Sequence, residues 1–248
     1  MQFLTLLAEI VFVIALLAVV AYWASNTLIK ARLAKILMAQ VELYHLPSED
    51  HRSTLLVLGD STAVGVGASS REDSVPGRLA HFMGATHTEN YAVSGAGVED
   101  IPSQITKATL SRYDTILVMV GGNNILAFDN VRWAGRILGE VLAELPQAEK
   151  VYVMNAGNAG GATLFPPPVR FFHTRTNLEY HKEFSRVCEA LGATYINLYM
   201  KPHEDPFLKE PEVYLSKDGL HPSSEGYRLW FEKLKEGIQK EPAGFPAG

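Results

Sequence analysis

The longest apolar run in the chain lies at its amino terminus, over residues 3–24, where Glu9 is the only charged residue. A helix of about 20 such residues matches the hydrocarbon thickness of a lipid bilayer. No basic residue precedes the run, and Tyr22 and Trp23 at its end are typical of the aromatic anchors at a membrane interface. A cleaved signal peptide has a basic start and a shorter apolar core. The pattern therefore favours a retained membrane helix over residues 1–28.

A second hydrophobic pattern follows the apolar run, over residues 31–46. Its apolar positions recur at spacings of three and four, which predicts that the chain stays helical there: Leu33, Ile36, Leu37 and Val41. Residues 46–53 are mostly polar and include Pro47, so we expect them to form the linker to a globular domain. The interval 29–52 is thus predicted to be a juxtamembrane helix with its linker.

The remainder of the chain alternates between short apolar runs and helical patterns. Five runs rich in Val, Ile, Leu and Tyr predict buried strands at residues 53–59, 89–93, 114–122, 150–157 and 193–199. Patterns with helical spacing lie at residues 75–83, 131–145, 177–191 and 223–239. This alternation predicts an α/β fold, a three-layer α/β/α sandwich around a mainly parallel sheet of about five strands. We assign this domain to residues 53–240 and expect residues 241–248 to be a frayed tail.

The composition excludes some classes of partner. The 248 residues are 47% hydrophobic, which suffices for one sizeable core. A net charge of −5 argues against nucleic acid as a partner, because phosphate binding needs clustered Lys and Arg. Cys188 is the single cysteine, so no intrachain disulfide forms, and its helical surroundings predict a core position. The apolar run contains no Gly-x-x-x-Gly pattern to indicate helix pairing, and the oligomeric state stays open.

Three basic residues follow the apolar run directly: Lys30, Arg32 and Lys35. Basic residues are enriched on the cytoplasmic side of membrane helices. The pattern therefore predicts a single-pass membrane protein whose main domain lies in the cytoplasm, while so few charges leave the exported side open.

Candidate catalytic residues stand at the carboxyl ends of the predicted strands, the edge at which parallel sheets bind ligands. The first strand leads into "GDS" with Ser61, the second into "SGAG" with Gly95, and the third into "GGNN" with Asn123. Near the carboxyl terminus, the stretch "DGLHP" places Asp218 three residues before His221. We therefore predict that these five residues meet at one edge of the sheet.

These residue types suit nucleophilic attack on a carbonyl group. A serine hydroxyl is a weak nucleophile until a base takes its proton, so His221 is the candidate base for Ser61. A carboxylate such as that of Asp218 fixes the tautomer and the orientation of the imidazole. The backbone N–H groups of Ser61 and Gly95, together with the side-chain amide of Asn123, are candidate donors to the oxyanion.

The chain resembles the SGNH (GDSL-type) hydrolase family, which is named for its Ser, Gly, Asn and His. Ser61, Gly95 and Asn123 match the first three blocks of the family, and "DGLHP" matches its Asp-x-x-His-Pro block, over about residues 55–234. The resemblance implies the SGNH hydrolase fold with a flavodoxin-like sheet, and a serine esterase that needs no metal or organic cofactor. Two departures concern the subfamily, since Asn124 stands where the family often has Asp and no leucine follows Ser61.

The longest stretch without a regular pattern covers residues 156–177 and follows the fourth predicted strand at the same edge. Long loops in compact domains are usually lids or binding loops. Three aromatic side chains in this stretch are candidates for lining an acyl pocket, or else pack on the core: Phe165, Phe171 and Phe172. The seven histidines other than His221 lack a comparable acidic partner and are expected at the surface or at helix ends, and no metal site is predicted.

The combined prediction is a membrane-anchored serine esterase that works through an acyl-enzyme. The nearness of a bilayer suggests lysophospholipids or other acyl esters as substrates. Two alternatives stay open: an esterase that removes O-acetyl groups from a glycan, and an inactive binding module tethered to the membrane. A small polar pocket would favour the glycan esterase, whereas an apolar groove toward the anchor would favour lipid esters.

Overall fold

A computed structural model describes residues 2–240, and the predicted tail at 241–248 lies outside the described residues. Five strands form one sheet in the order β2-β1-β3-β4-β5, and every neighbouring pair is parallel. The order is that of a flavodoxin-like, doubly wound sheet, so the predicted fold class is confirmed. The strands are β1 Thr54–Gly59, β2 His87–Asn90, β3 Arg112–Met119, β4 Gln147–Met154 and β5 Thr194–Ile196.

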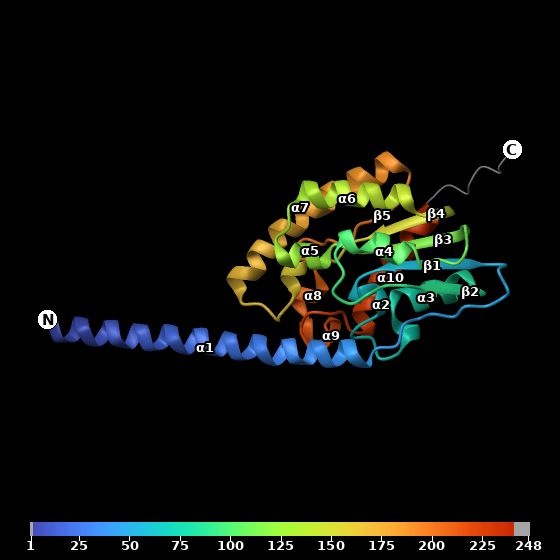
Figure 1. The fold of residues 1–248 in the computed structure, drawn as a ribbon. Coiled ribbons are helices and arrows are strands. Elements are labelled where there is room, and N and C mark those ends of the chain that lie inside the picture. The colour runs from blue at the N-terminus through green and yellow to red at the C-terminus, as the bar shows by residue number, and fades with distance from the viewer. Residues whose placement is uncertain (1, 241–248) are drawn as a thin grey trace.

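Helices cover both faces of the sheet (Figure 1). Leu55 and Val57 of β1 point to one face and Leu56 and Leu58 to the other, because side chains alternate along a strand. The first face packs against α3 Val75–Met83 and α10 Ser224–Lys240. The second packs against α4 Ile101–Ile105, α6 Val131–Glu144 and α7 Pro167–Leu191. Short helices follow the strand ends: α2 Ser61–Val64, α5 Gly122–Ala127, α8 Pro206–Lys209 and α9 Pro211–Tyr214.

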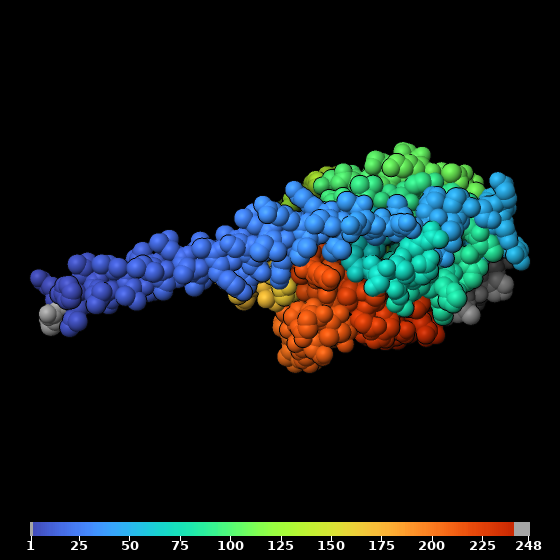
Figure 2. Space-filling model, turned by 90° about the horizontal axis from the view of Figure 1, so that it is seen from below, coloured from blue at the N-terminus to red at the C-terminus, as the bar shows by residue number. Residues whose placement is uncertain are grey.

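The chain begins with one continuous helix, α1 Gln2–Gln40, which extends far beyond the domain (Figures 1 and 2). Residues 2–22, the free half of α1, are exposed throughout, and Trp23 is the first residue of the helix that is half-buried. Among the described residues, α1 is one helix long and apolar enough to cross a membrane, with a mean hydropathy of 2.9 in its most apolar window.

Residues 23–40, the docked half of α1, pack against the domain (Figure 2). Ala34 is buried, and Leu37 and Met38 contact the hydrophobic core that α3 and α10 form with the sheet. Lys30 Nζ donates hydrogen bonds to the Thr163 carbonyl oxygen at 2.9 Å and to Thr163 Oγ1 at 2.7 Å. The second half of the helix is therefore part of the globular structure.

Helix α1 ends at Gln40, before the end that the sequence pattern predicts at residue 46. The chain turns there to pair with the sheet, since Leu46 and Thr88 of β2 exchange backbone hydrogen bonds of 2.9 and 3.0 Å in the antiparallel sense. Backbone pairing along β2 replaces the intrahelical hydrogen bonds that these residues would otherwise make.

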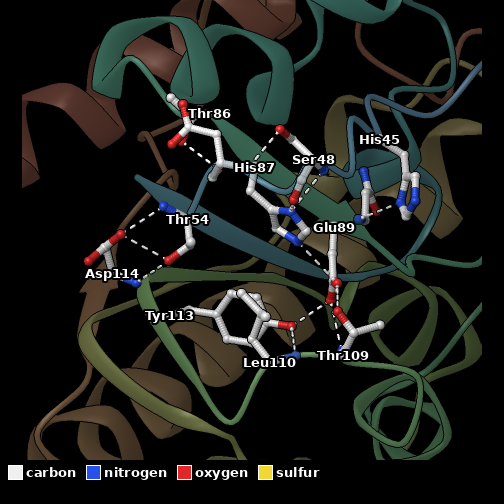
Figure 3. A network of polar contacts seen from close by, with 12 residues as sticks. His45, Ser48, Thr54, Thr86, His87, Glu89, Thr109, Leu110, Tyr113 and Asp114 are labelled. Carbon is white, nitrogen blue, oxygen red and sulfur yellow. Dashed lines mark hydrogen bonds and ion pairs between the residues drawn. The ribbon is translucent and has the colours of Figure 1, made fainter. Parts of the chain in front are cut away.

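A buried polar network fastens this segment to the sheet (Figure 3). His87 Nδ1 lies 2.7 Å from the Ser48 carbonyl oxygen, and His87 Nε2 lies 3.1 Å from Glu89 Oε1. The buried Glu89 carboxylate also accepts hydrogen bonds from the Tyr113 hydroxyl at 2.5 Å and from the Thr109 N–H at 3.1 Å. Burial acts to raise the pKa of Glu89, but these donors outweigh it and lower the pKa. The predicted linker is thus held along the sheet edge.

Helix α7 begins at Pro167, ten residues before the predicted start at 177, which corrects the expected long loop. The sequence has three prolines at residues 166–168, and proline suits the first turn of a helix because its φ is already helical and its missing N–H is not needed there. The irregular segment after β4 is therefore residues 155–166, with one 3-10 turn at Ala159–Gly161.

Candidate active site

The end of β1 presents Ser61 at the carboxyl edge of the sheet. A Cβ atom on Gly59 would lie 2.1 Å from the Met119 carbonyl oxygen of β3, so only glycine fits there. The Asp60 N–H donates to the same oxygen at 2.9 Å. The Asp60 carboxylate accepts from the Thr62 N–H at 2.8 Å and thereby caps α2, which starts at Ser61. This strand-to-helix turn fixes the direction of the Ser61 side chain.

Asp218 and His221 belong to one turn that precedes α10. The fully buried Asp218 carboxylate accepts hydrogen bonds from Ser216 Oγ at 2.7 Å, from the Leu220 N–H at 2.9 Å and from the His221 N–H at 3.0 Å. Burial acts to raise the pKa of Asp218, but the bonds from His221, Ser216 and Leu220 outweigh it and lower the pKa. Asp218 is therefore held as a carboxylate. The Ser216 hydroxyl had no role in the sequence prediction.

The three predicted catalytic side chains form one hydrogen-bonded row. His221 Nδ1 lies 2.5 Å from Asp218 Oδ2, and His221 Nε2 lies 2.9 Å from Ser61 Oγ, across 160 positions of sequence. With its proton on Nδ1, the imidazole donates to Asp218 and leaves Nε2 free to accept the Ser61 hydroxyl proton. All three side chains are buried, which excludes most water from the row.

Asn123 lies beside Ser61 in the lining of one pocket, as the second residue of α5. Its Nδ2 donates to the Ala96 carbonyl oxygen at 2.9 Å, which leaves the second amide hydrogen for a ligand. Gly95 precedes Ala96 in an exposed loop with a φ of 89°, a conformation that favours glycine, and it does not line the pocket. In the described part of the chain, the Ser61 N–H has no protein acceptor.

Asn124, the departure from the usual family pattern, is a structural residue. Its buried side chain accepts a hydrogen bond from the Val98 N–H at 3.0 Å through Oδ1. Its Nδ2 donates to the carboxylates of Glu99 at 2.9 Å and Asp129 at 3.0 Å. An aspartate here would lack these donors and would add a third carboxylate, which explains the asparagine.

The pocket beside Ser61 and His221 has a mostly apolar lining. The lining residues with apolar side chains or none are Gly122, Leu126, Ala156, Gly157, Ala159, Gly161, Ala162, Phe207, Leu215, Leu220, Pro222 and Trp230. The sequence prediction missed Phe207 and Trp230, because no spacing relates α8 or α10 to the strand-to-helix turn that leads to Ser61.

The three phenylalanines predicted to line an acyl pocket lie elsewhere. Phe165 packs edge-on against His173, with ring centroids 4.8 Å apart. Phe171 and Phe172 point outward from the first turns of α7 and are 59% and 56% exposed. Phe165 precedes the helix and packs on the buried His173, in line with the alternative of packing on the core. Phe171 and Phe172 meet neither expectation, because their segment is helical and the helix turns its other face to the domain.

Three of the histidines expected at the surface are buried instead: His87, His173 and His181. Burial is the main reason that the pKa of His181 falls to about 4, and it also lowers the pKa of His173. Within residues 2–240, no group of three or more His, Cys, Asp or Glu side chains is arranged to hold a metal ion.

The sequence profile of the GDSL-like lipase/acylhydrolase family matches residues 57–229, more than half of the chain. The protein therefore belongs to the GDSL-like lipase/acylhydrolase family. Its fold agrees with that assignment.

Individual relatives share the fold at low sequence identity. The chain is 28% identical over 187 residues to the GDSL-like esterase Rv1075c of Mycobacterium tuberculosis, covering 71% of this chain and only 58% of that protein. An extracellular lipase from Streptomyces rimosus superimposes with a TM-score of 0.56 at 17% identity, over 75% of this chain and 99% of the lipase. Phospholipase A1 from Streptomyces albidoflavus gives a TM-score of 0.55 at 15% identity, with the same coverage of 75% and 99%.

Proposed function

We propose that the protein is a membrane-anchored serine esterase that cleaves carboxylic esters with Ser61, His221 and Asp218. The observation that carries the proposal is the hydrogen-bonded row, with 2.9 Å between Ser61 Oγ and His221 Nε2 and 2.5 Å between His221 Nδ1 and Asp218 Oδ2. Membership of the GDSL-like lipase/acylhydrolase family supports it.

The reaction begins when Ser61 Oγ attacks the ester carbonyl carbon while His221 Nε2 takes the hydroxyl proton. The Asp218 carboxylate stabilises the imidazolium that forms. When the ester C–O bond breaks, His221 returns the proton to the departing oxygen, so an alcohol leaves and the acyl group stays on Ser61. Water then attacks the acyl-enzyme with His221 again as the base, which releases a carboxylic acid and restores Ser61.

Three donors are assigned to the negative oxygen of each tetrahedral intermediate. The Ser61 N–H and Asn123 Nδ2 both belong to residues that line the pocket. The Gly95 N–H is the third, held near Asn123 by the hydrogen bond from Nδ2 to the Ala96 carbonyl oxygen. Such donors act in a water-poor site, where each stabilises the oxyanion more strongly than it would in water.

The pocket wall supports one substrate class over the other. Alanine, leucine, phenylalanine and tryptophan side chains dominate the lining, and such a surface suits an acyl chain better than a sugar ring. We therefore favour acyl esters, lysophospholipids among them, over O-acetylated glycans. The lipase and phospholipase A1 named among the structural relatives support this choice.

The free half of α1 is assigned as a retained membrane anchor, with the catalytic domain in the cytoplasm. Lys30, Arg32 and Lys35 follow the apolar run directly, and basic residues are enriched on the cytoplasmic side of membrane helices. Protease added to sealed membrane vesicles of known orientation tests the side. Cleavage of the domain from the face opposite the cytoplasm would place it on the exported side.

Labelling with a fluorophosphonate probe tests the catalytic assignment. The wild-type chain is expected to form a stable adduct, and Ser61→Ala none. An unlabelled wild-type chain that is folded would favour the inactive binding module instead. A chain-length series of p-nitrophenyl esters, followed by lysophospholipid and acetylated-glycan assays, then selects the substrate class.

A further inference from the structure

Exposed phenylalanines gather at the amino-terminal end of α7. Phe171 and Phe172 are 59% and 56% exposed, and their rings contact each other edge to face with centroids 5.5 Å apart. Phe128 at the end of α5 is 50% exposed and stacks on His173 of α7 at 4.7 Å. Outside α1, the described residues include one more exposed phenylalanine, Phe82. We call Phe128, Phe171 and Phe172 the aromatic end of α7.

The aromatic end lies where the free half of α1 meets the domain (Figure 1). Thr27 Oγ1 of α1 donates to the Leu164 carbonyl oxygen at 2.9 Å, and α7 starts three residues later at Pro167. Trp23 is the first half-buried residue of α1. A helix rises about 1.5 Å per residue, so residues 2–22 span about 32 Å, close to the roughly 30 Å of a bilayer core. A membrane spanned by the free half would therefore end at the level of the aromatic end.

The charge around the aromatic end suits an anionic surface. Between Glu149 and Glu179 the sequence has no acidic residue and includes Arg170 and Arg175. Asp129, which follows Phe128, accepts a hydrogen bond from Asn124 Nδ2 at 3.0 Å. The Arg175 guanidinium carbon stands 6.0 Å from the centroid of the Phe171 ring. The chain as a whole carries a net charge of −5, so this segment is a local exception. Aromatic side chains flanked by arginines are the combination that binds the headgroup region of anionic bilayers.

We propose that the aromatic end of α7 rests in the bilayer surface, with Phe171 and Phe172 between the headgroups and the acyl chains. This inference rests on the membrane anchoring proposed above and adds a second contact with the lipid.

Hydrogen bonds join the first turns of α7 to the wall of the catalytic pocket. Arg170 Nε donates to the Gly160 carbonyl oxygen at 2.8 Å, and Thr174 Oγ1 donates to Asn158 Oδ1 at 3.0 Å. Asn158 lines the pocket that contains Ser61. A contact of α7 with the bilayer would therefore hold the pocket wall at the lipid surface. An acyl ester that leaves the membrane would reach the pocket there.

A fluorophore placed at one position of α7 tests the contact. Phe172→Cys in the full chain takes a nitrobenzoxadiazole label, because burial raises the pKa of the Cys188 thiol to about 12 and keeps it unreactive. Arg186→Cys is the matched control, since it lies 14 residues further along α7 and its side chain is 66% exposed. Both labelled chains are reconstituted into vesicles of phosphatidylcholine and phosphatidylglycerol. Some of the lipids in these vesicles carry a nitroxide on acyl carbon 5, which quenches the fluorescence of a nearby label.

We expect quenching at position 172 to exceed that at position 186 by at least about threefold. Equal quenching at both positions, in chains that float with the vesicles, would overturn the surface contact and leave the anchor intact. Chains that do not float would remove the anchor and this inference together. Fluorophosphonate labelling of the same samples reports separately on the catalytic assignment, and circular dichroism shows that each variant is folded.

Discussion

Asn123 and Asn124 are neighbours at the start of α5, yet their side chains meet different surroundings. Asn123 lines the pocket with one amide hydrogen bonded to Ala96 and the other available. Asn124 is buried and bonds to Val98, Glu99 and Asp129 with both ends of its amide. The first asparagine is thus placed to act on a substrate, and the second holds the loop before α4.

The pair gives a matched test of the oxyanion assignment. We expect Asn123→Ala to lower kcat on p-nitrophenyl acetate by about 100- to 1,000-fold, because one donor to the oxyanion is lost, with little change in melting temperature. Asn124→Ala leaves the Val98 N–H buried without its acceptor, which costs about 1–3 kcal/mol of stability. Its main effect should therefore be a lower melting temperature. Wild-type kcat in Asn123→Ala would exclude its amide from the oxyanion site.

His181 makes the stability of the domain depend on pH. It is buried on α7 against the Tyr195 hydroxyl, and burial lowers its pKa to about 4. An imidazole in the unfolded chain titrates near pH 6.5, so the unfolded state binds more protons between pH 4 and 6.5. Stability from this residue is complete above about pH 6.5 and is lost as the pH falls, by about 3 kcal/mol at pH 4.

Replacing His181 by a side chain that does not titrate measures how much His181 contributes to the pH dependence of stability. His181→Gln keeps a polar partner for Tyr195, so we expect a lower melting temperature than wild type at pH 7 and a gap that narrows toward pH 4.5. Thermal unfolding of both full chains in the same detergent checks this. A gap that stays constant over that range would show that His181 is not held neutral in the fold.

At the scale of elements, α10 is held against the turn that carries His221. A Cβ atom on Gly226 would lie 2.3 Å from the Tyr214 carbonyl oxygen and 2.9 Å from Phe207 Cε1, so the first turn of α10 touches the backbone of α9. Tyr227 in the same turn donates to the Val66 carbonyl oxygen at 2.8 Å. The position of the turn that carries His221 therefore depends on close packing by a glycine.

A glycine on another helix supplies the control. Gly226→Ala should destabilise the protein by about 1–3 kcal/mol and lower kcat, because α10 must move away from α9. On α6, a Cβ atom at Gly139 would meet Val187 Cγ1 at 3.8 Å, an ordinary contact. Gly139→Ala should therefore stabilise the helix by up to about 1 kcal/mol with unchanged kcat. Equal melting temperatures for the two variants would contradict the packing argument.

Hydrophobic patterns predicted the sheet and the edge where Ser61 and Asn123 lie, because a buried parallel strand needs a continuous apolar run that ends where polar chemistry begins. The same patterns failed for α7, whose first ten residues are rich in proline and arginine and lack a clear apolar stripe. With the start of that helix unknown, the outward direction of Phe171 and Phe172 was not predictable. The burial of His181 depends on contacts between distant segments, which local spacing does not encode.

At the scale of the whole molecule, α1 has two halves with different surroundings, and the boundary between them is Trp23. The free half presents only exposed side chains, whereas the docked half buries Ala34 and places Leu37 and Met38 on the core. Lys30 also joins the docked half to Thr163, in the segment that leads from the pocket to α7. The free half of α1 is therefore joined to the globular domain through one continuous helix that packs on the core, without a flexible spacer between them.

Two truncations separate the halves of α1. Residues 2–22 present only exposed side chains, so for a chain that lacks residues 1–22 we expect a folded protein with wild-type turnover of p-nitrophenyl acetate that no longer floats with vesicles. Removing residues 1–40 also uncovers the core beneath Leu37 and Met38, at about 1.5–3 kcal/mol for each fully buried side chain and less for half-buried ones. A loss of about 3 kcal/mol lowers the melting temperature of a domain of this size by roughly 10 °C. Identical melting curves for the two truncated chains would show that the docked half is a passive tether, since a helix that completes the core cannot be removed without a loss of stability.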